Sequence, residues 1–511
     1  METISDDQKP SVPIILRGGG AVELDLKDSV SAIAEISEEV GLKPCKTYFD
    51  MVPAETMYEY GAYGIPGRFG HWTHGRDYYR MKTMYDHGFS KIYELVINDD
   101  PAYAYLLETN PPIANKLVVA HVVGHVDFFQ KNMTFSHTNR RMVETVQQTA
   151  ARFAEYEDLY GIDAVEAVID AAISLSKNID THPKGFNRLP KDQYVAESLR
   201  RSRDELKGKG ISTSEYDDIW SLGAPKKEEP NERPKITVPY EADPDLMWVI
   251  SEFSPILMDW QKDILLSVRA EQQYFIPQML TKIMNEGWAS LWHTRITREL
   301  IARGLVSDDE AMQYARLHSG VISGNRRNLN PYGLGLRIWE DIDDKYHGRV
   351  DWGEEREIDR WGEVIDPESY VGREDHDIFR VRETMVDQGF LRNFLSGRII
   401  RELDLYGYRR EGDRLVVEEK DPQKIREGLV ASMDRWGLPS IVIPKGGANY
   451  TSSRELYLEH EFEGEELDEK YAQETLKRVF YLWGRPVHLQ ARIRGSETTI
   501  HCSEGPTVLT V

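Results

Sequence analysis

The sequence predicts an α+β protein with a large, mainly helical N-terminal domain and a smaller C-terminal α/β domain. Three observations support this prediction. The 511 residues exceed the roughly 250–300 residues at which a single core stops growing. Apolar residues recur with helical spacing through most of the first 400 positions. After about residue 400, short runs of β-branched residues dominate instead.

The first part of the helical domain is expected over residues 22–200. Residues 22–44 carry apolar side chains at helical spacing with acids between them, and Gly41 and Pro44 mark the end of that helix. Aromatic residues, glycines and histidines crowd residues 48–93, which indicates an ordered, packed loop region of the kind that often carries function. Helical patterns follow at about 100–134 and 142–177.

A charged segment, residues 201–244, separates the two parts of the helical domain. Between residues 201 and 240 there are eight Lys or Arg and eight Asp or Glu, with four prolines. That composition is typical of a linker or a long surface loop. The second part of the domain is expected over residues 245–398. It contains a predicted helix at 277–304, with Pro277 at its start and Gly304 just past its end.

Residues 400–511 alternate strands and helices. The strand-like runs are RLVVEE, SIVIP, ELYLEHEF, VHLQARI and TTIHC, and helical patterns interrupt them at 422–436 and 468–483. The order strand–helix–strand–strand–helix–strand, with one strand added, resembles a ferredoxin-like α/β sandwich. We expect this part to be a separate domain.

Composition limits the classes of function. There are 63 Lys and Arg against 86 Asp and Glu, and the resulting net charge of -23 would repel nucleic acid and anionic membranes. No apolar run approaches the roughly 20 residues of a transmembrane helix. Because the first residues are acidic and polar, unlike a secretory signal, we expect a cytoplasmic protein. The two cysteines, Cys45 and Cys502, exclude a disulfide framework.

The chemistry predicted from the sequence centres on histidines. His121 and His125 are four residues apart in a predicted helix, so both imidazoles lie on one face. This spacing is typical of a divalent metal site that takes further ligands from elsewhere. Val122 stands where hydrolases with this motif carry a general-base Glu. Because the flanking residues are apolar, both could also be core histidines with satisfied hydrogen bonds.

Glu286 and His293 strengthen the metal interpretation. They are seven residues apart, so on a helix they differ by only about 20° in direction. An unpaired carboxylate and imidazole are costly to bury on an apolar face. One solution is a metal ion, zinc being our first expectation, bound by His121, His125, Glu286 and His293. The other is a closed, hydrogen-bonded polar core. Glu94 is a candidate general base in place of the missing Glu.

The chain resembles the stage V sporulation protein R (SpoVR-like) family at HWTHGRDYYR, KIYELVINDDPAYAYLLETN, AHVVGHVDFFQKN, WQKDILLSVRAEQQYFIPQMLTKIMNEGWASLWH, LHSG and NPYGLG. The resemblance runs from about residue 25 to the C-terminus. It implies a link to sporulation, through spore cortex formation, or to a stress response. It also implies two partners, a PrkA-type serine protein kinase and a von Willebrand A-like protein. It implies no established reaction.

A looser similarity connects the two helices to gluzincin metallopeptidases, in which two histidines and the Glu of an EGWA-like segment bind zinc. Carried over to this chain, it implies a metallopeptidase-like helix pair with His121, His125 and Glu286 as ligands. His293 would then be a fourth ligand, a donor to the transition state, or part of a second metal site. Val122 departs from the pattern at the position of the catalytic Glu.

Two functions follow from these observations. The first is a metal-dependent hydrolase of peptide or amide bonds, with a metal-activated water as nucleophile and Glu94 as base. The second is a non-enzymatic adaptor whose buried polar core is structural and whose C-terminal domain binds the kinase or the von Willebrand A-like protein. The buried face of Glu286 and His293 favours the first, and Val122 favours the second.

Overall fold

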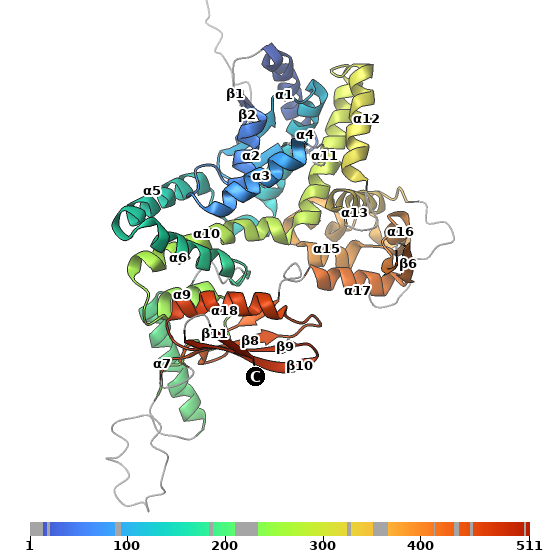
Figure 1. The fold of residues 1–511 in the computed structure, drawn as a ribbon. Coiled ribbons are helices and arrows are strands. Elements are labelled where there is room, and N and C mark those ends of the chain that lie inside the picture. The colour runs from blue at the N-terminus through green and yellow to red at the C-terminus, as the bar shows by residue number, and fades with distance from the viewer. Residues whose placement is uncertain are drawn as a thin grey trace, which may run out of the picture. The chain divides into compact units, whose positions relative to one another are not determined.

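Helices dominate the fold, and three sheets accompany them (Figure 1). This computed structural model describes residues 14–17, 21–86, 94–182, 188–209, 234–323, 329–350, 366–412, 414–433, 439–449, 453–504 and 507–510. The predicted α+β class is confirmed. Among the helices in these ranges, none is long and apolar enough to cross a membrane.

The chain divides into two compact units that are both discontinuous in sequence. The first unit combines residues 1–150 with 274–437, and the second combines residues 151–273 with 438–511. The predicted charged linker falls in the second unit, and its residues 210–233 lie outside the described ranges. All the candidate site residues belong to the first unit.

A four-stranded sheet opens the first unit. Its order is β1 (Ile14–Arg17), β2 (Thr47–Val52), β4 (Ala102–Leu107) and β3 (Glu94–Ile97), and only β3 runs antiparallel to its neighbour. Two expectations for this region are wrong: a packed loop region over residues 48–93 and a helix that starts at about residue 100. β2 and β4 occupy parts of these ranges instead. Buried and half-exposed residues alternate along β4 and the first part of β2, as the period of a strand requires. Two helices, α2 (Ala54–Tyr63) and α3 (Trp72–Asp86), also lie within the expected loop region.

Three helices form the centre of the first unit. α4 (Pro112–Lys131) is buried along almost its whole length and packs against α11 (Lys282–Ala302), which packs in turn against α13 (Pro331–Tyr346). Glycines allow these close approaches. A Cβ added at Gly124 would lie 2.7 Å from the Cα of Ala289, and one at Gly287 would lie 2.3 Å from the backbone of Gly335. The helix backbones are therefore in direct contact, which fixes their spacing.

The start of α11 differs from the prediction. Pro277 lies inside α10 (Asp259–Leu280), and α11 begins only at Lys282. The reason is a cap from a distant segment, because the carboxylate of Asp387 accepts hydrogen bonds from the N–H groups of Ile283 (2.8 Å) and Met284 (2.9 Å). The predicted end of this helix is confirmed, because α11 ends at Ala302 and Gly304 lies just past it with a φ of 71°.

Shorter elements complete the first unit. They are α1 (Ala21–Glu39), α12 (Asp308–Ile322), α14 (Ile378–Thr384), α15 (Asp387–Phe394), α16 (Gly397–Glu402), α17 (Pro422–Ser432), the hairpin of β5 (Gly407–Glu411) and β6 (Arg414–Glu419), and the 3-10 turns Met133–His137, Pro367–Tyr370 and Glu374–His376. α1 packs on α4 and on β1, and α12 packs on α4.

The second unit contains a five-stranded sheet. Its order is β11 (Thr507–Thr510), β10 (Ser496–Glu504), β9 (Val487–Ile493), β8 (Leu456–Glu461) and β7 (Ser440–Val442). Only β8 and β9 are parallel, and α18 (Glu469–Trp483) connects them. The other helices are α6 (Ile162–Leu175), α7 (Lys191–Gly208) and α9 (Leu246–Phe253), with a 3-10 turn at Gly447–Asn449. Two helices, α5 (Met142–Tyr160) and α10, have residues in both units.

The expected ferredoxin-like arrangement is not confirmed. Its first strand, RLVVEE, is β6, which pairs with β5 in a separate two-stranded sheet. The helix that follows, α17, places Ile425 and Val430 in the hydrophobic core of the first unit. The burial of α17 therefore keeps this part of the chain in the first unit, apart from the strands that come after it.

Candidate metal centre

The helix pair α4 and α11 brings His121, His125 and Glu286 together. Their side chains are 3%, 5% and 16% exposed. Nε2 of His125 lies 3.4 Å from Oε2 of Glu286, and Nε2 of His121 lies 3.6 Å from the same oxygen. The two imidazoles are one turn apart on α4, as the i, i+4 spacing requires. Three of the predicted ligands therefore converge on one point.

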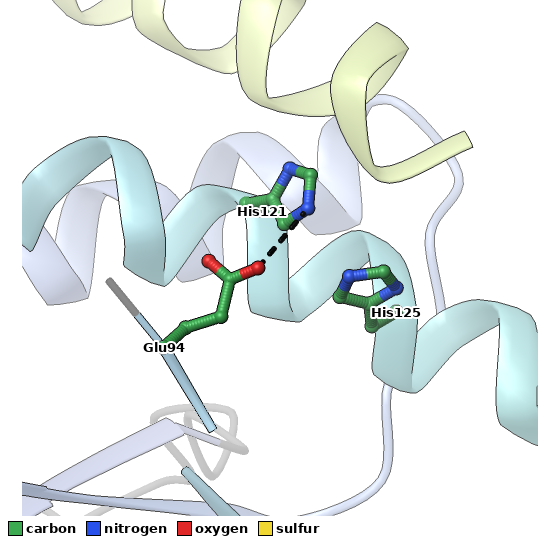
Figure 2. Close-up of side chains that lie close together, drawn as sticks. All are labelled: Glu94, His121 and His125. Atoms are coloured by element: carbon green, nitrogen blue, oxygen red, sulfur yellow. Dashed lines mark ion pairs between the residues drawn. The ribbon is translucent and has the colours of Figure 1, made fainter. Parts of the chain in front are cut away.

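Glu94 joins them from the sheet. It is the first residue of β3, and its Oε1 lies 3.5 Å from Nε2 of His121. Figure 2 shows its carboxylate extending toward His121, with His125 one turn further along the same helix. Single ligand atoms of Glu94, His121 and His125 all lie within 4.8 Å of one another. We refer to these three residues and Glu286 as the His–Glu group.

Two atoms of the His–Glu group lack partners. Nε2 of His121 and Oε2 of Glu286 are buried, and no described residue forms a hydrogen bond with either. Leaving a buried polar atom unsatisfied costs about 1–3 kcal/mol. Two ligands that are each about 2.1 Å from a tetrahedral ion lie about 3.4 Å apart, which is close to the 3.4 and 3.6 Å found here. The residues therefore fit a divalent metal ion.

A neighbour on α11 orients His125. Nδ1 of His125 lies 2.9 Å from Oδ1 of Asn285. An amide oxygen can only accept, so Nδ1 carries a proton, and Nε2 is the nitrogen that is left to bind a metal ion. This is the arrangement in which a histidine binds a metal through Nε2 and is held in place through Nδ1.

His293 lies behind His121. Its Nδ1 is 2.8 Å from Nδ1 of His121, and its Nε2 is 2.9 Å from Nδ1 of His318. When Nε2 of His121 binds a metal, its Nδ1 carries the proton and donates to His293. His293 then accepts at Nδ1 and donates from Nε2 to His318. The structure therefore brings His293 to the site through His121, with both of its ring nitrogens already engaged.

Burial and neighbouring charges shift the pKa values of these residues. Burial disfavours the carboxylate of Glu286, but the two facing imidazoles outweigh it and hold the pKa of Glu286 well below its ordinary range. Burial also disfavours the charged form of His125. The facing carboxylate of Glu286 outweighs this effect, so the pKa of His125 is raised. Burial, then His121 and His318, lower the pKa of His293 well below its ordinary value, so His293 is neutral at pH 7.

The His–Glu group borders a cavity of about 590 Å³. Its lining residues are Glu94, Ala114, Leu117, Val118, His121, His293, Arg316, Leu317, Gly320, Val321 and Tyr332. The ring of Tyr332 stacks on that of His121, with centroids 6.0 Å apart. Cavities of this size hold small-molecule ligands. A ligand in the cavity would contact Glu94 and His121 directly.

Tyr332 and Arg316 are not among the residues predicted from the sequence. Tyr332 lies in the first turn of α13, which begins at Pro331. A local signal existed, because Asn330 caps the helix through its side chain and Pro331 occupies the first turn. Arg316 carries no comparable signal in the sequence.

Two further histidines, His318 and His74, differ in their surroundings. His318 bonds to His293, as described above. The ring of His74 packs against Tyr63 and Phe69, with centroids 4.6 and 5.9 Å away, and its Nε2 lies 3.4 Å from Nη1 of Arg68. Burial, followed by the Arg68 charge, lowers the pKa of His74 to about 4. His74 is thus a buried, neutral histidine.

Fold and site together define an α+β protein with a candidate metal-binding group on two packed helices. The chain belongs to the SpoVR family: the model of the SpoVR-like protein family matches residues 23–438, and that of the SpoVR-like C-terminal domain matches residues 446–493. It is 27% identical over 488 residues to the uncharacterized protein YcgB of Escherichia coli (strain K12), covering 90% of each chain. No solved structure matches the chain.

Proposed function

We propose that the first unit is a metal-dependent hydrolase in which His121, His125 and Glu286 bind one divalent transition metal ion, with zinc as the first expectation. The observation that carries this proposal is the pair of buried, unsatisfied atoms, Nε2 of His121 and Oε2 of Glu286, at the spacing that two ligands of one ion would have. A closed polar core would leave no such atoms, because burying them without partners is unfavourable.

Glu94 takes the role of general base in this proposal. It lines the cavity, whereas Glu286 does not, and its side chain is 20% exposed. A bound metal ion would polarise the substrate carbonyl and activate water. The carboxylate of Glu94, 3.5 Å from Nε2 of His121, can accept a proton from the attacking water and return it to the leaving group. It would thus replace the Glu that is absent at Val122.

Tyr332 and His293 have supporting roles. Burial, followed by the charges of Glu286 and Glu94, raises the pKa of Tyr332, so its hydroxyl stays protonated. That hydroxyl can donate a hydrogen bond to a substrate oxygen as negative charge develops there. His293 is assigned a positioning role, because its hydrogen bond fixes the ring of His121.

The type of bond that we propose as the target is inferred from similarity to a known class of enzymes. The pairing of an HxxxH helix with a later EGWA helix resembles the zinc site of gluzincin metallopeptidases, which supports a peptide or amide bond as the target. The proposal places this activity in the cytoplasm, in support either of spore cortex formation, as the SpoVR family name suggests, or of a stress response.

Elemental analysis of the purified full-length protein tests the metal proposal. We expect about one equivalent of a transition metal in the wild type and little in His121→Ala, His125→Ala or Glu286→Ala. His74→Ala is the matched control, because it removes a buried histidine outside the group and should keep the metal. A wild type that binds no metal even after reconstitution would contradict the proposal.

A second experiment tests the reaction. Glu94→Gln keeps the size of the side chain and should keep the metal, but it removes the base. Against a panel of amide substrates we expect turnover to fall by about 10²–10⁴-fold. Unchanged turnover in Glu94→Gln would exclude Glu94 as the base while leaving the metal site in place.

The alternative is a non-enzymatic adaptor that works with a PrkA-type serine kinase and a von Willebrand A-like protein. One observation favours it: α18 of the second unit exposes two tyrosines, Tyr471 at 77% and Tyr481 at 42%. Exposed aromatic residues are common at protein interfaces. This function predicts that the purified kinase or von Willebrand A-like protein binds Glu286→Ala as tightly as the wild type, and binds Tyr471→Ala more weakly.

A further inference from the structure

The cavity beside the His–Glu group contains one cationic side chain. Arg316 of α12 lines it, and no other Lys or Arg does so among the residues that the structure describes. Arg316 is exposed, and its side chain forms no ion pair or hydrogen bond with any described residue. Glu94 is the acid that lines the same cavity, from β3. In a chain with a net charge of -23, an unpaired cation facing a cavity is available for an anionic ligand.

Two helices contribute apolar side chains to the wall of the cavity. α4 contributes Ala114, Leu117 and Val118, and α12 contributes Leu317 and Val321. An apolar wall with a few polar groups that fix orientation is typical of small-molecule sites. The cavity therefore combines a surface for an aliphatic group, a cation, and the His–Glu group.

We propose that this cavity binds a substrate that carries a free carboxylate beside an apolar side chain, and that Arg316 pairs with the carboxylate. An acylated amino acid, or the C-terminal residue of a peptide, has this chemistry. Guanidinium groups bind carboxylates through two parallel hydrogen bonds. Arg316 lines the cavity from α12 and Glu94 lines it from β3, so a substrate whose carboxylate pairs with Arg316 can present its amide bond to Glu94. This inference rests on the proposed hydrolase function for the bond that is cleaved.

Equilibrium binding of two probes tests this pairing without any turnover. The probes are N-acetyl-leucine and its primary amide, which differ only in the carboxylate. Isothermal titration calorimetry would be performed with the full-length protein, both metal-free and zinc-loaded. We expect the acid to bind about tenfold more tightly than the amide, as for a hydrogen bond to a charged partner. Arg316→Ala should abolish the preference, and Arg316→Lys should keep part of it.

Two variants serve as controls. Arg298→Ala removes an exposed arginine of α11 that does not line the cavity, and it should keep the full preference for the acid. Gly320→Leu fills part of the cavity, because a Cβ at Gly320 would meet nothing within 4 Å. It should weaken binding of the acid and the amide by the same factor, since it blocks the apolar wall and leaves Arg316 in place.

Three results would overturn the inference: equal binding of acid and amide, a preference that survives Arg316→Ala, or no binding of either probe. The metal content of the same preparations separates this inference from the proposed function. A wild type without metal refutes the metal site, whereas the preference of the metal-free protein for the acid depends only on Arg316 and the apolar wall.

Discussion

The same two helices, α4 and α11, carry two buried polar clusters of opposite character. One is the His–Glu group. The other, which we call the Asp127 cluster, consists of Asp127, Trp288 and Arg382. Oδ2 of Asp127 accepts hydrogen bonds from Nε1 of Trp288 (3.0 Å) and Nη1 of Arg382 (2.6 Å), and Oδ1 accepts one from the N–H of Lys43 (2.8 Å).

The difference is in how the carboxylates are satisfied. Both oxygens of Asp127 accept hydrogen bonds from the protein, whereas Oε2 of Glu286 accepts none from the described residues. Asp127 follows His125 by two positions on α4, and Trp288 follows Glu286 by two positions on α11. Burial therefore does not distinguish the two clusters. The unsatisfied atoms do, because only a ligand can complete the His–Glu group.

The largest expected effect is on folding, and it concerns the Asp127 cluster. Asp127→Ala removes the buried partner of Arg382 and leaves it only the half-exposed Glu383, a loss that costs about 3–5 kcal/mol. Glu286→Ala in metal-free buffer should cost less, because Oε2 of Glu286 forms no hydrogen bond and faces the imidazoles of His121 and His125 only at 3.6 and 3.4 Å. Chemical denaturation of both variants measures the difference. Equal losses of unfolding free energy would show that the two clusters are both structural.

Metal addition should give the next largest effect, and only through the His–Glu group. Zinc at a free concentration 100-fold above its dissociation constant should raise the unfolding free energy by about 2.7 kcal/mol. The same addition should leave Glu286→Ala unchanged. His74→Ala should respond like the wild type, and thermal denaturation with and without zinc reports all three. A zinc response in Glu286→Ala would mean that the ion binds elsewhere.

Removal of the orienting residues should weaken metal binding less than removal of a ligand. Asn285→Ala frees the ring of His125, and His293→Phe frees that of His121. Each should lower zinc affinity by about 10–100-fold, as for other outer partners of ligating histidines. His293→Gln, which keeps a polar group near His121, should recover part of the loss. Competition with a chelator measures the affinities, and an unchanged affinity would exclude a positioning role.

The smallest effect concerns His74, a buried histidine outside both clusters. Its pKa in the folded protein is about 4, below the ordinary value of 6.5. The unfolded chain therefore binds the proton first as the pH falls, so stability is lost between about pH 6.5 and pH 4 and is level below that range. We expect about 1 kcal/mol after allowance for solvent screening.

His74→Gln tests this pH dependence. It should lack that part of the pH dependence of the unfolding free energy, whereas His182→Gln, at an exposed position, should keep it. Identical pH profiles for the wild type and His74→Gln would show that burial alone does not perturb a histidine in this fold.

Local spacing predicted the parts of the site that lie on helices. The i, i+4 interval of His121 and His125 and the i, i+7 interval of Glu286 and His293 each define one face, because the helical period is fixed. No local pattern predicts that residues more than 160 positions apart, such as His125 and Glu286, lie close together. The strings shared with the SpoVR family, and the pairing of the two helices, supplied that expectation, and the structure brings Glu94, His121, His125 and Glu286 together.

Other parts could not be predicted from local patterns. The strand AYAYLL was interpreted as the start of a helix, although its tyrosines alternate with buried residues. The start of α11 depends on Asp387, which lies more than 100 positions away. His293 was expected among the ligands, and its contacts with His121 and His318 depend on the packing of α11 against α4 and on the position of α12.

The contact between Gly124 and Ala289 has a consequence for ion selectivity. Since the backbones of α4 and α11 already touch there, neither helix can move toward the other. The packing of the two helices then sets the distance between the side chains of His125 and Glu286. This distance limits the size of the ion that both residues can bind. Ligand atoms 3.4 Å apart fit a tetrahedral ion with bonds of about 2.1 Å, and the two imidazole nitrogens suit zinc better than calcium, which takes oxygen ligands. Glu286→Asp, shorter by one carbon–carbon bond of about 1.5 Å, would leave a gap that the helices cannot close.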